Sequence, residues 1–226
     1  MRDGAMEDRL RRDRDALVEA MLPHVPFDGW TPGCARRAAA DAGLEPEDAG
    51  RLFPAGPIDI VAHYCDLADR RMLVALAERD LPSLRVRDRI ATAVRVRLEA
   101  HAGERVAIRR AIAVTAMPPH AAAAARALYR TVDAIWRVAG DTATDFSFYT
   151  KRGLLAWVYT STLLYWLDDE SEGQADSWAF LDRRIGEVLQ IPKIRGRVER
   201  AFRFAPNPVR TARAFRRGAA QFRARR

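Results

Sequence analysis

The side chains that could do chemistry are dispersed along this chain of 226 residues. Its four histidines are interpreted as surface or satisfied core residues, and they are His24, His63, His101 and His120. No Glu-x-x-His pair, HExxH, GxSxG, P-loop or GxGxxG motif occurs, so the ligands of a di-iron bundle and the common nucleophile and phosphate signatures are missing. The three acids from Asp168 to Glu170 fit a polar loop at a helix end better than an acid–base pair. The sequence therefore predicts no catalytic residue, no metal site and no cofactor.

Cysteine usage and hydropathy indicate the compartment. Cys34 and Cys65 are too few for a disulfide framework and form no CxxC pair, so we interpret both as reduced thiols of a cytosolic protein. The first 22 residues are densely charged and lack the apolar core of a secretory signal. The longest uncharged apolar stretch, Gly153–Leu167, has 15 residues, whereas a membrane span needs about 20.

Charge is divided unevenly along the chain. Residues 193–226 carry 12 basic side chains against one acid, a net charge of +11. Residues 1–192 carry 26 basic and 29 acidic side chains, a net charge of −3. Because the body is mildly acidic, this distribution argues against nucleic-acid binding over the whole surface. We therefore treat residues 193–226 as a separate basic tail.

Apolar residues recur at steps of three and four, and no period-two pattern is long enough for a sheet. About nine helices with short turns are expected, which predicts an all-α bundle. Thr31 and Pro32 are typical of an N-cap and a first-turn proline, and residues 121–138 form one clear amphipathic helix. The last helix of the body is expected to be capped by Asp176 or Ser177.

Residues 1–57 predict a helix-turn-helix region, ending in Leu52-Phe53-Pro54 before a long helix. The pattern resembles the N-terminal module of TetR regulators, which implies a TetR-like fold. The segment that should read DNA, LEPEDAGRLF, has three acids against Arg51 and would repel phosphates. We expect a degenerate module without nucleic acid. The competing interpretation is a TetR-like, ligand-responsive transcriptional regulator that forms a homodimer.

The most specific pattern lies in residues 141–191, which contain DFSFYTKRGLLAWVYTSTLLYWLDD and then DSWAFLDRRIGEV. This region resembles the signature of the ubiquinone (coenzyme Q) biosynthesis accessory family, which binds lipid, has a TetR-like fold and is not known as an enzyme. The resemblance implies a hydrophobic cavity for isoprenoid quinone intermediates within residues 58–192. It also implies a membrane-docking last helix and a partner, the di-iron demethoxyubiquinone hydroxylase, to which the lipid is presented.

In that family an aromatic–Tyr–Thr–basic–Arg patch contacts the hydroxylase. Carried onto matching positions, the patch comprises Asp145, Phe148, Tyr149 and Arg152. The family usually has Trp where this chain has Phe148, which keeps an aromatic anchor and loses an indole donor. Aromatic residues and arginine spaced over one helical turn could share an exposed face. The alternative is that Tyr149 is a core residue and Arg152 a solvated first-turn charge.

The helix inside residues 141–169 is apolar almost all round, which is typical of a central helix or of one lining a cavity. The residues expected on the cavity side, where lipid would bind, are Leu154, Trp157, Val158, Leu164 and Trp166. A dry packed core is the alternative. Burial of an isoprenoid is favourable by about 0.8 kcal/mol per CH₂, so such a lipid needs an apolar container to leave a bilayer.

The tail predicts a basic amphipathic helix that begins at Asn207-Pro208. Phenylalanines lie on one face and arginines cover the rest, and the expected membrane-binding residues are Arg210, Arg213, Phe215, Arg217 and Phe222. Such a helix lies on an anionic lipid surface. A solvated disordered tail and a nucleic-acid tail are the alternatives. The resulting expectation is a cytoplasmic protein, peripheral on the inner face of the bacterial inner membrane.

Overall fold

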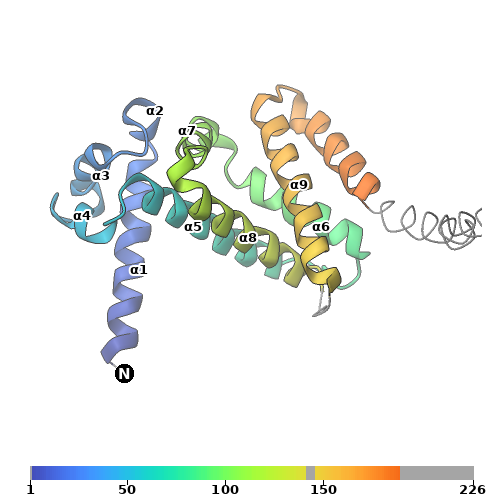
Figure 1. The fold of residues 1–226 in the computed structure, drawn as a ribbon, viewed down its shortest axis with the longest axis horizontal. Helices are drawn as coiled ribbons and strands as arrows, with labels where there is room; N and C mark the ends of the chain where they lie inside the picture. Colours follow the sequence, from blue (N-terminus) through green and yellow to red (C-terminus); the bar gives the residue numbers. More distant parts are fainter. Residues whose placement is uncertain (1, 141–145, 189–226) are drawn as a thin grey trace, which may run out of the picture. The chain divides into compact units, whose positions relative to one another are not determined.

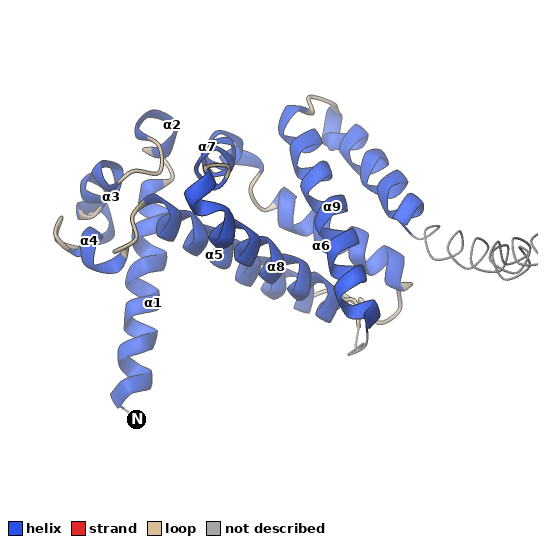
Figure 2. Ribbon diagram, viewed as in Figure 1, coloured by secondary structure: helices blue, strands red, loops and turns tan. Residues whose placement is uncertain are grey.

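The computed structural model describes residues 2–140 and 146–188 of the protein, with side chains for residues 4–140 and 150–188. Every regular element in this part of the chain is a helix, and Figure 2 draws no strand in it. The predicted all-α fold is confirmed. It follows from the apolar steps of three and four, which place one stripe of each helix in the core.

The chain divides into two compact units, Met1–Asp182 and Arg183–Arg226. The first helices, drawn in blue in Figure 1, are α1 (Arg2–Met21), α2 (Val25–Asp28), α3 (Pro32–Ala38) and α4 (Asp48–Leu52). They are followed by α5 (Pro57–Ala77), α6 (Val86–Glu99), α7 (Arg105–Thr115), α8 (Ala121–Val138) and α9 (Phe146–Asp168). Residues 175–188 are also helical. The 3-10 turns are Ala40–Ala42, Ala102–Glu104, Pro118–His120 and Glu172–Gln174.

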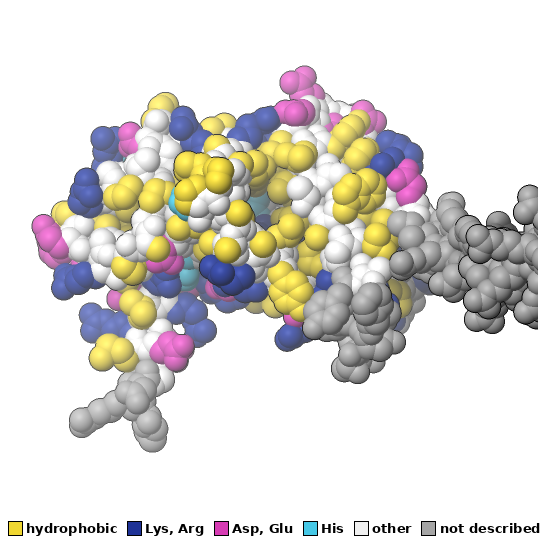
Figure 3. Space-filling model, in the orientation of Figure 1, with side chains coloured by type: hydrophobic (Ala, Val, Ile, Leu, Met, Phe, Trp, Pro, Cys, Tyr) yellow, Lys and Arg dark blue, Asp and Glu magenta, His cyan; other side chains and the backbone are white. Residues whose placement is uncertain are grey.

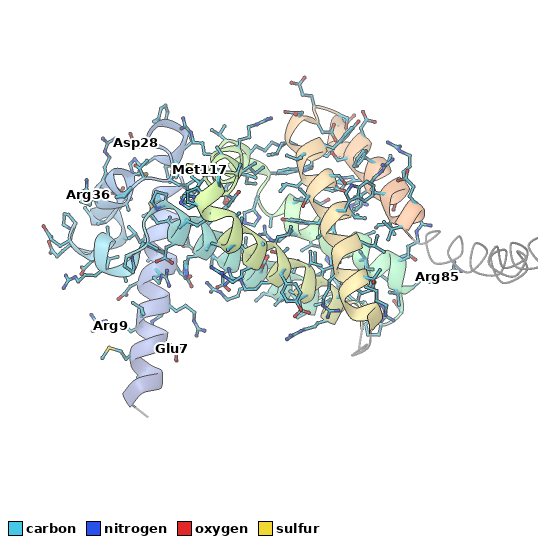
Figure 4. The ribbon with its side chains drawn as sticks, in the orientation of Figure 1. Glu7, Arg9, Asp28, Arg36, Arg85 and Met117 are labelled. Carbon is cyan, nitrogen blue, oxygen red and sulfur yellow. The ribbon has the colours of Figure 1, made fainter. Side chains whose placement is uncertain are left out.

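The short helix α3 begins where the sequence predicts. The Thr31 side chain accepts a hydrogen bond from the Cys34 N–H at 3.1 Å, and Pro32 takes the first helical position. Gly43 follows the next turn with a φ of 68°, a left-handed conformation that glycine adopts without steric cost. α3 and α4 pack against the second half of α1, while Glu7 and Arg9 project from its outer half (Figure 4). These helices form the N-terminal module.

α5 is the central helix of the bundle and packs against α1, α6, α7 and α8. In Figure 1, α5 and α8 run side by side, and α9 packs on α8. The Trp30 indole N–H donates to the Ala107 carbonyl at 2.9 Å, and the Trp30 ring lies 4.9 Å from the Tyr64 ring. This buried tryptophan therefore joins the N-terminal module to α5 and α7.

The helix over residues 175–188 is capped by Asp169, and the predicted caps Asp176 and Ser177 were wrong. The Asp169 carboxylate accepts hydrogen bonds from the Ser171 N–H at 2.8 Å and the Ser177 N–H at 2.9 Å, and also from the Ser177 hydroxyl. The Ser171 hydroxyl accepts from the Asp176 N–H. Asp169 thus satisfies amide groups that a helix start leaves without partners.

None of the described helices combines the length and the hydropathy that crossing a membrane requires. Among the same residues, no group of three or more His, Cys, Asp or Glu side chains is arranged to hold a metal ion. The predicted basic tail, residues 193–226, lies outside the described residues.

Candidate functional site

An apolar cavity of about 330 Å³ lies in the unit Met1–Asp182 and is lined by side chains of α5 to α9. Its volume is at the lower end of the range of small-molecule pockets. Partly exposed residues mark its mouth, and they are Ile112, Thr115, Ala124, Leu128, Leu163 and Leu164. On the face shown in Figure 3, hydrophobic side chains, drawn in yellow, gather over α7 and α9. Ala125 and Thr160 are also exposed in the lining, so the rim is mainly apolar, with Thr115 and Thr160 as its polar members.

The inner end of the cavity is polar. Arg97 of α6 and Thr131 of α8 line it, and both contact the buried Asp69 of α5. The Arg97 Nε–H donates to Asp69 Oδ1 at 2.9 Å, and the Thr131 hydroxyl lies 2.9 Å from each Asp69 oxygen. Arg97 Nη2 also donates to the Cys65 carbonyl at 3.3 Å. Three helices thus contribute to one buried hydrogen-bonded cluster, which we call the inner polar cluster (Asp69, Arg97, Thr131).

The ionisation of these groups follows from their burial and their neighbours. Burial lowers the pKa of Arg97, but negative charge on Tyr159, which ionises only at high pH, and on Asp69 outweighs burial and holds that pKa above its ordinary value, so Arg97 is a cation. Burial raises the pKa of Asp69 while Arg97 and Thr131 act in the opposite direction. Burial also raises the pKa of the Tyr159 phenol against the effect of Arg97. Tyr159 is therefore a protonated hydrogen-bond donor at neutral pH.

Of the five residues expected on the cavity side, only Leu164 lines this cavity. Leu164 is 49% exposed at the mouth. The expectation was wrong for the other four: Val158 and Trp166 are fully buried between helices, Trp157 is 47% exposed, and half-buried Leu154 is not in the lining. α9 instead contributes Tyr159, Thr160 and Leu163. Because α9 is apolar on nearly every side, its hydropathy could not reveal which face meets the cavity.

The predicted partner patch is only partly visible. Asp145 lies outside the described residues, and so do the side chains of Phe148 and Tyr149. Arg152 is 5% exposed and pairs with Asp133 of α8 at 2.7 Å. It is therefore neither part of an exposed patch nor a solvated first-turn charge, and both interpretations of Arg152 are corrected. A buried arginine needs a carboxylate partner, which α8 supplies.

The five expected membrane-binding residues, Arg210, Arg213, Phe215, Arg217 and Phe222, lie outside the described residues. In the N-terminal module, the segment expected to face DNA folds into the short helix α4. Its Arg51 pairs with Asp48 one turn away, at 2.5 Å. The one basic side chain of this segment is thus already bound to an acid of the same segment.

The histidines have separate partners. His24 lies 3.0 Å from Asp41 and His63 lies 2.7 Å from Asp15, in both cases between side chains. The Nδ1 atoms of His101 and His120 lie within hydrogen-bond distance of backbone carbonyls. Each histidine therefore has a partner of its own within the protein, and none lies among the residues that line this cavity.

The arrangement of the helices and the cavity inside the bundle define a protein of the TetR-regulator fold. A solved structure described as the TetR transcriptional regulator from Nitrosomonas europaea ATCC 19718 matches with a TM-score of 0.62 and 22% sequence identity. The match covers 78% of this chain and 97% of that one. At this identity the likeness establishes the fold, which confirms the TetR-like prediction.

The family follows from sequence. The COQ9 family model matches residues 121–192. The mitochondrial ubiquinone biosynthesis protein COQ9 of Drosophila melanogaster is 31% identical over 201 residues, which are 87% of this chain and 61% of the fly protein. The human protein of the same name is 28% identical over 188 residues, 77% of this chain and 57% of its own length. This chain spans about three fifths of the length of these relatives, and the matches together support a COQ9-like family with the TetR fold.

Proposed function

We propose that the protein is a non-enzymatic accessory factor of ubiquinone biosynthesis that binds an isoprenoid, quinone-type lipid. The relatives are named for ubiquinone biosynthesis. The observation that carries the proposal is the apolar cavity among α5 to α9, which has a few buried polar groups in its lining and a mainly apolar exposed rim. An amphiphile with a small head and an apolar chain matches such a container.

The ligand is presented to a demethoxyubiquinone hydroxylase along the outer face of α9. Exposed residues repeat there at steps of four, three and four, and they are Gly153, Trp157, Thr160 and Leu164. This stripe runs from the first turns of α9, next to Phe148 and Tyr149, to the mouth. Phe148 and Leu164 lie about 24 Å apart along α9 at 1.5 Å per residue. A hydroxylase anchored at Phe148 and Tyr149 must therefore cover the stripe to reach the mouth.

The basic tail brings the mouth to a membrane in this proposal. Twelve basic side chains against one acid, in residues 193–226, favour an anionic surface by about 1 kcal/mol per charge close to it. Deleting residues 207–226 should abolish pelleting with vesicles that contain anionic phospholipid and leave the unfolding temperature unchanged. Unchanged pelleting would remove the tail from the proposal.

The experiment for the cavity is lipid extraction from the purified full chain, followed by mass spectrometry. The parent protein should carry an isoprenoid lipid. Ala124→Trp fills the mouth, since Ala124 is half-buried in the lining, and should lower the lipid content at least tenfold. Ala122→Trp is the matched control because Ala122 is exposed on the same helix outside the lining. A parent protein without isoprenoid or other lipid contradicts the proposal.

A ligand-responsive transcriptional regulator is the second candidate, and the TetR fold favours it. It needs a surface that accepts phosphates, yet Arg51 pairs with Asp48 in the segment that should face DNA. A gel shift of the full chain and of the chain without residues 207–226 separates the candidates. A sequence-specific shift that survives the deletion would favour the regulator.

A further inference from the structure

The inner end of the cavity holds hydrogen-bond donors without a partner. Arg97 has five N–H donors, and its bonds to Asp69 and the Cys65 carbonyl use Nε and Nη2. Within the described residues, Nη1 of Arg97 makes no hydrogen bond, and neither does the Tyr159 hydroxyl. Both side chains are buried and line the cavity. Neither the Arg97 Nη1 atom nor the Tyr159 hydroxyl is among the fully buried side-chain atoms that lack a partner, so both reach the cavity, where an acceptor that arrives from outside can pair with them.

The charge balance selects the kind of acceptor. Arg97 is a cation, and Asp69 accepts hydrogen bonds from both Arg97 and Thr131, as a carboxylate does. The cluster is therefore close to neutral, and adding an anion would place an uncompensated charge in a buried site. A neutral oxygen, such as a ring carbonyl or an ether, accepts from Tyr159 and Arg97 without that cost.

The position of the unpaired donors sets the direction of the ligand. Arg97 and Tyr159 are buried, whereas Ile112, Leu163 and Leu164 are partly exposed. A polar head that pairs with Arg97 and Tyr159 therefore leaves its chain directed toward the exposed part of the lining. A cavity of about 330 Å³ holds such a head and the start of a chain, so a long isoprenoid tail must remain outside.

We propose that Tyr159 and Arg97, held by Asp69 and Thr131, form a head-group subsite for a neutral ring that carries acceptor oxygens, with the apolar tail leaving through the mouth. The inference rests on the proposed function and adds which residues bind the ligand head and which way the head points. The subsite binds by hydrogen bonds alone.

Isothermal titration of the full chain with three probes tests the subsite. The probes are a dimethoxy-methyl-1,4-benzoquinone with one prenyl group, prenylbenzene without oxygen, and a prenylated benzoate. The quinone should bind tighter than prenylbenzene and tighter than the benzoate. Tyr159→Phe should weaken the binding of the quinone by about two- to tenfold, the effect of one net hydrogen bond. The affinity for prenylbenzene should be unchanged. Tyr165→Phe, an exposed tyrosine on the same helix, is the matched control.

The outcomes separate the two proposals. Unchanged quinone binding in Tyr159→Phe, or an equal loss for quinone and prenylbenzene, overturns the subsite and leaves the cavity as a lipid site. If the benzoate binds the parent protein more tightly than the quinone does, the inference of a neutral head is overturned. This comparison needs only the parent protein. If neither the quinone nor prenylbenzene binds the parent, the proposed function fails as well.

Discussion

Two buried arginine–aspartate pairs lie in the helical bundle, and they differ in what surrounds them. Arg97 pairs with Asp69 at 2.9 Å at the inner end of the cavity. Arg152 pairs with Asp133 at 2.7 Å between α8 and α9, and neither residue lines the cavity. All four side chains are largely buried. The first pair faces an open volume, whereas the second connects two helices.

This difference shows which of the two pairs is expected to act on a ligand. A buried ion pair is weak evidence for stability, because removing both charges from water costs about as much as their attraction returns. Breaking a pair by removing one partner is nevertheless strongly destabilising. Arg152 should therefore behave as a structural residue. Arg97 should affect stability and ligand binding together, and variants of the two arginines can separate these effects.

Arg152→Glu should have the largest effect. The substitution places a second carboxylate beside Asp133 in a buried site, where the exposed Arg137 is the remaining cation that contacts Asp133. A loss of about 3–5 kcal/mol in the free energy of unfolding is expected, measured by urea denaturation. Arg126→Glu makes the same charge change at an exposed position of α8 and should have little effect. Equal stability of the two variants would show that Arg152 does not hold α8 and α9 together.

Arg97→Lys should have the second largest effect on stability. Lysine keeps the charge but loses the planar fork that reaches Asp69 and the Cys65 carbonyl, at a cost of about 1.5–3 kcal/mol. A cavity ligand at 100 times its Kd stabilises the parent by about 2.7 kcal/mol. At the same ligand concentration the stabilisation should be smaller in Arg97→Lys and unchanged in Arg152→Lys. Thermal unfolding with and without the prenylated quinone measures this stabilisation in both variants. An equal loss of ligand-induced stabilisation in Arg97→Lys and Arg152→Lys would contradict the different roles of the two pairs.

The fold was predictable where signals are local. The sequence places the N-cap at Thr31 and the helix over residues 121–138, because a capping hydroxyl, prolines and apolar spacing act within one or two turns. The cap at Asp169 had a signal that was missed. An aspartate that bonds the backbone two residues later is a common turn, and Asp169 does so with Ser171.

The sequence predicted that an apolar cavity exists, but not which residues line it. Its inner polar cluster joins Asp69, Arg97 and Thr131 from three helices, at separations that no local pattern encodes. The same is true of Arg152, whose partner Asp133 stands 19 residues earlier. On α9 the apolar pattern indicates burial but not direction, so Tyr159 was missed while Trp157 was expected at the cavity. Tertiary packing, rather than residue type, decides which side of such a helix faces a ligand.

Asp169→Ala extends the comparison to a buried carboxylate that is held by amides and a hydroxyl. Loss of this cap should cost about 0.5–2 kcal/mol at pH 7. Burial acts to raise the pKa of Asp169, but the hydrogen bonds from Ser171 and Ser177 hold that pKa far below its usual value. The folded pKa lies below the unfolded one, near 3.9, so the stabilisation is complete above that pH and declines as the pH falls further.

Urea unfolding of the parent and of Asp169→Ala at pH 7 and in steps below pH 4 gives the measurement, and the two curves should converge in acid. The control is Asp168→Ala, which removes an exposed carboxylate at the last residue of α9 that pairs with Arg109 at 2.7 Å. Its effect should stay small at every pH. A stability difference for Asp169→Ala that stays constant into acid would contradict the ionised cap.

Arg137→Gln should have the smallest effect, although Arg137 binds the same carboxylate as Arg152. Arg137 Nη2 lies 2.8 Å from Asp133 Oδ2, but its side chain is 76% exposed. Exposed ion pairs contribute about 0.2–1 kcal/mol because water and salt screen them. The small loss in the free energy of unfolding should diminish further in 0.5 M salt, while the loss in Arg152→Gln should persist. If the two glutamine variants lost equal stability, burial would not be what separates the two arginines, and the structural role of the Arg152–Asp133 pair would have to be abandoned.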